Sequence, residues 1–181
     1  VVEDRVVQED ESLREAVLLY SREIAFSAAD VYAKAAEARG LWDARLEALV
    51  VDSILSGEHE EELASRIAAL GWRARGPVAA IIGTANEPFD QDGLRRIARK
   101  NNADVLVGVH GNRLIVVIGR ISVEANEKPE SFKKLAGSLD AFFGNGAIVI
   151  GPEVSSISEA TTSAKAALAG FAVVKSWPKP P

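Results

Sequence analysis

Four basic residues between positions 95 and 100 form the densest group of side chains in this sequence that could hold an anion. They occupy one short stretch that also contains Leu94, Ile97 and Ala98, and they are Arg95, Arg96, Arg99 and Lys100. Guanidinium and ammonium groups bind phosphate and carboxylate, so this cluster is our candidate surface for an anionic ligand. The same spacing is typical of the solvent face of an amphipathic helix, and that alternative stays open.

The remaining residues offer little for catalysis. The two histidines, His59 and His110, have no second ligand or base at a usable spacing, and we expect both to be ordinary solvated side chains. The sequence has no GxxxxGK[ST], GxGxxG, HExxH or GxSxG motif, and with no cysteine it has no thiolate nucleophile or thiolate metal ligand. We therefore predict no cofactor, no metal site and no catalytic residue.

Composition describes an ordinary globular chain. Of its 181 residues 48% are hydrophobic, and the net charge of -5 argues against general nucleic-acid binding by this chain. We expect a cytoplasmic protein with no membrane partner, because no signal segment or long apolar run is present and the absence of cysteine fits a reducing compartment. There is also no methionine, and residues 178–181 resemble the start of a proline-rich linker, so we expect more protein on both sides.

Alternating apolar residues predict a small antiparallel sheet. Residues 104–119 read as two strands joined by a turn at Gly111 and Asn112, a pair that tolerates the positive φ of a two-residue hairpin. A strand at 77–84 and a helix at 91–102 precede the hairpin, and a helix at 129–144 and a strand at 147–151 follow it. This βαββαβ order predicts a ferredoxin-like α+β domain, extended by a helix at 156–170, opened by a Ser156–Glu159 capping box, and a strand at 171–177.

A helical region is expected before the sheet. Residues 1–11 read as a flexible lead-in, and Ser12 with Glu15 forms a capping box that opens a helix ending at Gly40. One narrow stripe on that helix has the spacing of a coiled-coil seam: Leu13, Val17, Tyr20, Ile24, Ala28, Val31 and Ala35. We assign dimerisation to the stripe, the alternative being that it packs on its own domain.

Two shorter helices, at 43–56 and 59–70, should follow, with stops at Gly57 and at a Schellman motif formed by Gly71 and Trp72. The expected organisation is a helical dimerisation and linker region over 12–73 and a sheet domain over 74–177.

With these elements in order, residues 77–176 resemble a GGDEF-type nucleotide-cyclase palm domain, whose signature occupies the turn of the central hairpin. Here that turn is His110, Gly111, Asn112 and Arg113, and the end of the first strand, at 82–84, lacks the metal-binding aspartate of the family. The resemblance implies a cyclase fold that has lost the carboxylates needed to hold Mg²⁺.

Residues 43–177 are also similar to the PucR/CdaR family of bacterial transcription regulators, chiefly in LASRIAALGW (63–72) and GPEVSSISEATTSAKAALAG (151–170). Among them the chain most resembles the actinobacterial branch that regulates fatty-acid and mycolic-acid synthesis genes. This implies a dimerising, effector-sensing core that reaches promoter DNA through a separate C-terminal helix-turn-helix domain, with an effector such as an acyl thioester. The alternatives are a divergent nucleotide cyclase or phosphotransferase and a pure oligomerisation scaffold.

Overall fold

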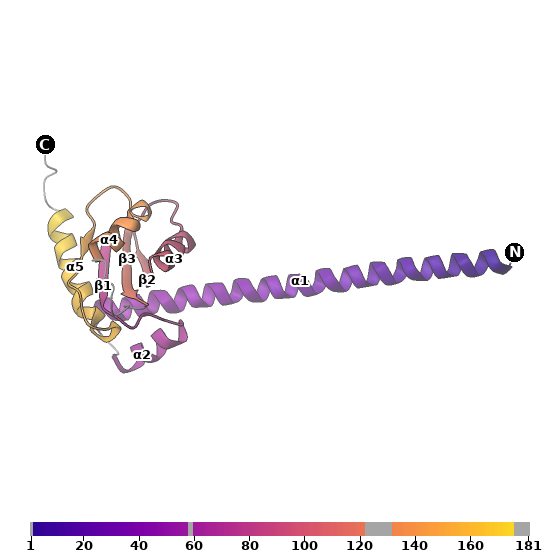
Figure 1. Ribbon diagram of the computed structural model, residues 1–181, viewed down its shortest axis with the longest axis horizontal. Helices are drawn as coiled ribbons and strands as arrows, with labels where there is room; N and C mark the ends of the chain where they lie inside the picture. The colour runs from indigo at the N-terminus through magenta and orange to yellow at the C-terminus, as the bar shows by residue number, and fades with distance from the viewer. Residues whose placement is uncertain (1, 58–59, 122–131, 176–181) are drawn as a thin grey trace. The chain divides into compact units, whose positions relative to one another are not determined.

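The chain forms two units that we describe separately. A computed structural model describes residues 2–57, 60–121 and 132–175, and its contacts divide the chain between Asp43 and Ala44. Residues 44–73, which the sequence grouped with the N-terminal helix, pack in the same unit as the sheet. The order of elements can be followed in Figure 1.

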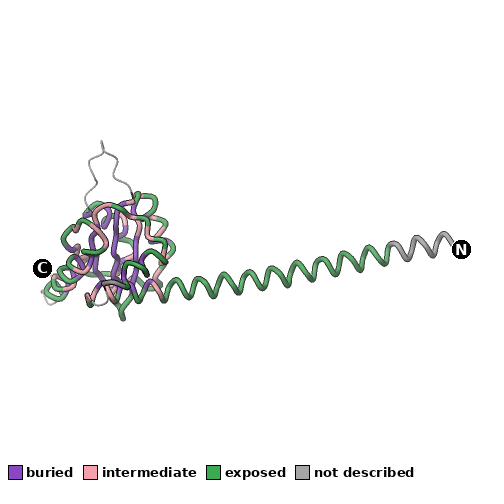
Figure 2. Tube along the Cα trace, turned by 90° about the horizontal axis from the view of Figure 1, so that it is seen from below, coloured by how far each residue is buried: buried purple, intermediate pink, exposed green. Residues whose placement is uncertain are grey.

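The first unit belongs to one long helix, α1 (Val2–Ser56). The expected flexible lead-in over 1–11 is wrong, because the helix begins at Val2, and Ser12 is therefore no N-cap. Gly40 does not end the helix either, since a glycine inside a helix costs only about 0.5–1 kcal/mol relative to alanine and good helix formers flank it. All residues over 11–45 are exposed (Figure 2), and Gly57, at a φ of 75°, follows the last residue of α1.

The second unit is built on a four-stranded antiparallel sheet. Its strands lie in the order β2-β3-β1-β4 and are β1 (Val78–Thr84), β2 (Ala103–His110), β3 (Arg113–Arg120) and β4 (Val149–Ile150). With α3 (Gln91–Lys100) between β1 and β2 and α4 (Phe132–Ser138) between β3 and β4, this is the predicted ferredoxin-like βαββαβ arrangement. The α+β prediction is confirmed.

The central hairpin forms as expected. His110 pairs with Arg113 in the β2–β3 register, and the positive φ of the turn falls on Gly111, at 61°. A residue with a side chain is strained at such a φ, so glycine at this position favours the tight turn.

Each face of the sheet is covered by helices. On one face Leu94 and Ala98 of α3 and Leu135 of α4 pack against inward-facing residues such as Ile81 and Val116. The other face is covered by the end of α1, by α2 (Glu60–Ala69) and by α5 (Ala160–Lys175), through Val50, Val51, Ile54, Leu63, Ile67, Ala160, Ala164, Ala167 and Phe171. This second layer fixes the last turns of α1 on the sheet.

The predicted Schellman stop after α2 is confirmed. The Gly71 amide donates to Ala68 and the Trp72 amide donates to Ile67, with Gly71 at a φ of 73°. Trp72 then packs against the core that contains Ile67. His59 lies outside the described residues.

Three expectations for the C-terminal third need correction. The strand predicted at 171–177 is helical as far as Lys175, because Phe171 continues the spacing of the buried alanines of α5; residues 176–177 lie outside the described residues. The helix predicted at 129–144 is shorter, with α4 followed by the 3₁₀ turn η1 (Asp140–Phe142), and 129–131 are not described. The Ser156–Glu159 capping box is also wrong, since Glu159, in the 3₁₀ turn η2 (Ile157–Glu159), accepts from the amide and hydroxyl of Ser155.

No helix within the described ranges combines the length and apolar character needed to cross a membrane.

Candidate functional site

The hairpin turn is tied to the end of α1 by a histidine–aspartate contact. His110 Nε2 lies 2.7 Å from Oδ1 of Asp52, and both side chains are about half exposed, at 41% and 50%. The contact is an ion pair when the imidazole is protonated. The carboxylate of Asp52 therefore lies at the turn, but it belongs to α1 and not to the turn itself.

The other residues of the turn make structural contacts of their own. The Arg113 guanidinium lies 5.8 Å from the ring centre of Phe171 on α5, a cation–π contact. The Asn112 carbonyl accepts from the Ala85 amide at 2.8 Å, which ties the turn to the chain just after β1. Within the described ranges, no three histidine, aspartate or glutamate side chains gather as a metal site would require.

An open hollow of about 630 Å³ lies beside the turn. Its wall combines two leucines, two serines and three ionisable side chains, from α1, α2 and β2: Leu49, Asp52, Ser53, Leu55, Ser56, Arg66 and His110. Arg66 also pairs with Glu62 at 2.6 Å, and that glutamate is 62% exposed. The hollow therefore combines apolar surface with ionisable groups of both signs, and its two basic groups, Arg66 and His110, are each paired with a carboxylate, Glu62 and Asp52.

A buried carboxylate on α1 anchors this region to the sheet. Glu47 is 1% exposed; its Oε1 accepts from the Val107 amide and its Oε2 from Gln91 Nε2, both at 2.8 Å, and it forms an ion pair with Arg95. Burial raises the pKa of Glu47, and the nearby Arg95 charge and the Val107 amide oppose that rise. Because Val107 lies on β2, the edge strand of the sheet as the described residues form it, the carboxylate satisfies an amide that no described strand pairs with.

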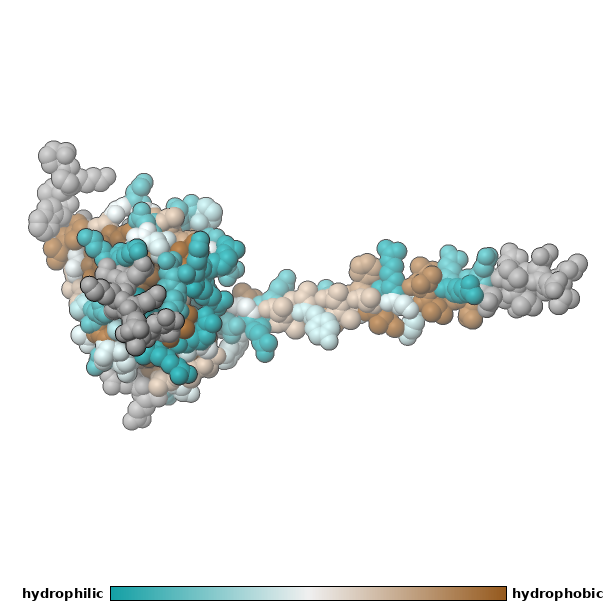
Figure 3. All heavy atoms as spheres, viewed as in Figure 1, coloured by the Kyte–Doolittle hydropathy of each residue, from teal (hydrophilic) through white to brown (hydrophobic). Residues whose placement is uncertain are grey.

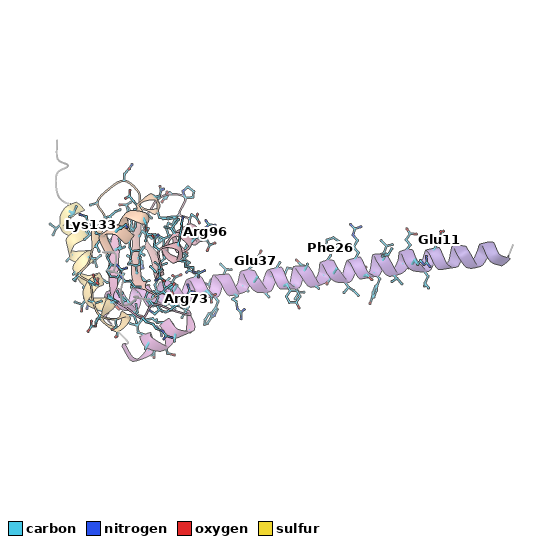
Figure 4. All side chains as sticks on the ribbon, in the orientation of Figure 1. Glu11, Phe26, Glu37, Arg73, Arg96 and Lys133 are labelled. Carbon is cyan, nitrogen blue, oxygen red and sulfur yellow. The ribbon has the colours of Figure 1, made fainter. Side chains whose placement is uncertain are left out.

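The basic cluster is not one surface in the structure. Arg95 is engaged with Glu47, whereas Arg96, labelled in Figure 4, is 76% exposed and lies 3.8 Å from Asp90. Arg99 and Lys100 are exposed in the last turn of α3. Arg96, Arg99 and Lys100 remain the candidate anionic-ligand surface, without Arg95.

The dimerisation residues predicted on α1 are all solvent-exposed. The exposed fractions are 63% for Leu13, 56% for Val17, 67% for Tyr20, 52% for Ile24 and 62% for Val31. Hydrophobic residues alternate with hydrophilic ones along this part of α1 in Figure 3. Leu18, Leu19, Phe26, Tyr32 and Leu41 are exposed as well, so the exposed apolar surface on this part of α1 is broader than the predicted stripe. Exposed apolar surface of this kind is typical of a region that contacts another protein.

Sequence reasoning missed Glu47 and Asp52. Glu47 shares a helix face with the buried Val50, Val51 and Ile54, and a lone carboxylate among apolar residues three, four and seven positions away is a signal that periodicity could have detected. Asp52 has no such signal, because its partner, His110 at the hairpin turn, is 58 positions away in the sequence.

Residues 56–173 match the family described as the GGDEF-like domain. The chain is also 37% identical over 174 residues to Uncharacterized protein Rv2242 of Mycobacterium tuberculosis and, at the same identity, to Uncharacterized protein Mb2266 of Mycobacterium bovis. These matches cover 89% of this chain and 40% of each relative, so the chain spans less than half of their length.

The fold is shared with a solved structure. The crystal structure titled Regulator of Polyketide Synthase Expression, from Bifidobacterium adolescentis, superposes with a TM-score of 0.62 over 75% of this chain and 52% of that chain. Sequence identity between the two is 15%, so the likeness is one of fold.

Proposed function

Since the chain belongs to the GGDEF-like domain family, we propose that it is the dimerising, effector-sensing core of a PucR/CdaR-like transcription regulator and is not an enzyme. One observation carries the proposal: the hairpin turn contains no carboxylate, and its His110 is bound instead to Asp52 of α1. The name of the structural neighbour, a regulator of gene expression, supports the same function. The likeness to the actinobacterial branch favours fatty-acid and mycolic-acid synthesis genes as targets.

Loss of catalysis follows from the residues at two positions. The turn from His110 to Arg113 supplies no hard oxygen from an acid, and β1 ends in Gly83 and Thr84 where the resemblance calls for an aspartate. A pair of Mg²⁺ ions needs such carboxylates to bind and activate a nucleoside triphosphate.

The test of this point is incubation of the chain with GTP and Mg²⁺ or Mn²⁺, followed by chromatography, with a competent cyclase as positive control. We expect no cyclic dinucleotide and no consumption of GTP. Turnover above that of a sample without protein would favour the divergent cyclase or phosphotransferase instead.

Self-association is assigned to α1. Its exposed apolar row offers several large side chains, each worth about 1.5–3 kcal/mol when fully buried, which is enough to offset the entropy lost when two chains associate. The partner we propose is a second copy of this chain, so the protein acts as a homodimer or a higher oligomer.

The effector site is assigned to the hollow beside the turn. Leu49 and Leu55 suit an apolar chain, and Arg66 and His110 suit an anionic head group that draws them away from Glu62 and Asp52, so the ligand class is an amphipathic anion such as an acyl thioester. A ligand there would contact both α1 and the hairpin, and could shift the His110–Asp52 contact.

Thermal-shift measurements with a long-chain acyl thioester test this site against the basic cluster. We expect stabilisation of the chain, lost in Arg66→Ala and kept in a paired Arg99→Ala/Lys100→Ala variant. The reverse pattern would move the ligand to α3, and no stabilisation in any variant would favour a pure oligomerisation scaffold.

DNA binding is assigned to a C-terminal helix-turn-helix of the longer protein. The net charge of -5 leaves this chain without the excess of basic residues that phosphate contacts require. A two-fold dimer sets the spacing of paired half-sites on DNA, so effector binding in this core could change operator affinity at a distance. We propose a cytoplasmic protein.

A further inference from the structure

The seam on α1 extends beyond Ala35 in the same pattern. Ala38 and Trp42 follow at steps of three and four residues, and both are exposed, Trp42 to 64%. Together with the residues named earlier, the seam then covers 13–42, all within the first unit, and on this narrow stripe no residue is charged.

The seam has nearly the same spacing in both chain directions. Without Ala28, the steps between successive seam residues are four, three, four, seven, four, three and four, and they read the same in both directions. The midpoint lies between Ser27 and Ala28. The residues counted are Leu13, Val17, Tyr20, Ile24, Val31, Ala35, Ala38 and Trp42. A second copy running in the opposite direction can therefore set Val17 against the partner's Ala38 at the same level along the axis, and Tyr20 against the partner's Ala35.

Side-chain size distinguishes the two directions. In a parallel pair Tyr20 would face the partner's Tyr20 while Ala35 faced the partner's Ala35, so the separation between the helices would have to differ between these two levels. In an antiparallel pair Val17 and Tyr20 face the partner's Ala38 and Ala35, while Ile24 faces Val31 and Leu13 faces Trp42. The mismatch between the levels of Tyr20 and Ala35 is then smaller, which favours close packing of the seam.

From these relationships we propose that two copies of the chain pair antiparallel through α1, with the two-fold axis between Ser27 and Ala28. The inference rests on the dimerisation proposed above and adds its direction and register. Ala28 lies near the axis, whereas the two copies of Val17 lie about 31 Å apart along it at 1.5 Å per residue.

Single cysteines test the arrangement without background, because the chain has none of its own. Three variants at exposed positions suffice: Val17→Cys, Ala28→Cys and Ala38→Cys. Under mild oxidation Ala28→Cys should form a disulfide dimer alone. Val17→Cys and Ala38→Cys should each stay unlinked alone, and equal mixing of the two should raise the disulfide yield at least tenfold.

Other results distinguish a wrong direction of pairing from the absence of a dimer. Efficient homodisulfides of both Val17→Cys and Ala38→Cys would show a parallel pair, overturning the inference while keeping the proposed dimer. No disulfide in any sample, with light scattering still showing a dimer, would overturn pairing through α1. A monomer by light scattering at the same concentration would remove the dimerisation on which the inference rests.

Discussion

Glu47 of α1 and Arg95 of α3 form an ion pair in which the carboxylate is 1% exposed and the guanidinium remains 33% exposed. The pair connects the last turns of α1 to the helix that covers the opposite face of the sheet. Burial raises the pKa of Glu47, and the Arg95 charge and the Val107 amide oppose that rise, while Gln91 also donates to the carboxylate.

Glu47→Ala should lower the free energy of unfolding by about 2 kcal/mol, because it leaves the Val107 amide without an acceptor and Arg95 without its counter-charge. The partial exposure of Arg95 keeps the loss below that for a fully buried pair. Urea denaturation measures it, with Arg96→Ala as control: the Arg96 side chain is 76% exposed on the same helix and should change stability by less than about 0.5 kcal/mol. Equal losses in the two variants would contradict the anchoring role.

The same carboxyl group should make stability depend on pH. Burial raises the pKa of Glu47 above its ordinary value of 4.5, so the folded chain holds this proton more tightly than the unfolded chain. The stability contributed by the protonated group is fully present below pH 4.5 and is lost as pH rises through the higher folded pKa.

Wild type should therefore lose unfolding free energy relative to Glu47→Gln as pH rises from about 4 towards neutrality. Parallel urea titrations of the two proteins at several pH values give the difference. A difference that moves in the opposite direction would mean that Arg95 and the hydrogen bonds outweigh burial.

Close packing of α5 on the sheet predicts a contrast between two glycines. A Cβ placed on Gly151 would lie far too close to the backbone oxygen of Ser163, so Gly151→Ala should destabilise the second unit by about 1–3 kcal/mol. Gly137, inside α4, has open space around it, and Gly137→Ala should be neutral or stabilising by up to about 1 kcal/mol. Thermal unfolding of both variants gives the comparison, and a similar loss in each would argue against this contact.

The seam on α1 predicts a response to charge. Val17→Asp combined with Ile24→Asp places two carboxylates where the proposed dimer buries apolar side chains, and should halve the mass measured by light scattering. The matched control is Ala29→Asp with Ala36→Asp, which adds the same charge on the opposite face of the helix and should leave the dimer intact. An unchanged oligomer in the seam variant would refute the assignment.

Local patterns predicted the sheet well. The alternation over 104–119 and the glycine at 111 define a hairpin without reference to distant residues, and the observed register of His110 with Arg113 follows from the turn length. Competition between two local signals explains the error at 171–177. Strand-forming residues occur there, but Phe171 falls four positions after Ala167 on the buried face of α5, and burial of that face outweighed the intrinsic preference.

Contacts between distant segments could not be predicted in the same way. The pairing of Arg95 with Glu47 spans 48 positions, and that of His110 with Asp52 spans 58, and neither leaves a spacing that a single sequence shows. The sequence pattern therefore predicted Arg95 as part of a basic surface. The long α1 was missed for a different reason, since Gly40 and the Ser12–Glu15 pattern are helix-boundary signals whose small energies the rest of the helix overrides.

The central claim is a division of labour, in which this chain dimerises and senses an effector while another part of the longer protein binds DNA. The most direct test is a mobility-shift comparison of this chain and the full-length protein on the protein's own upstream region at matched salt. The account predicts specific binding by the full-length protein only, changed in affinity by an acyl thioester. Comparable specific binding by this chain alone would contradict it.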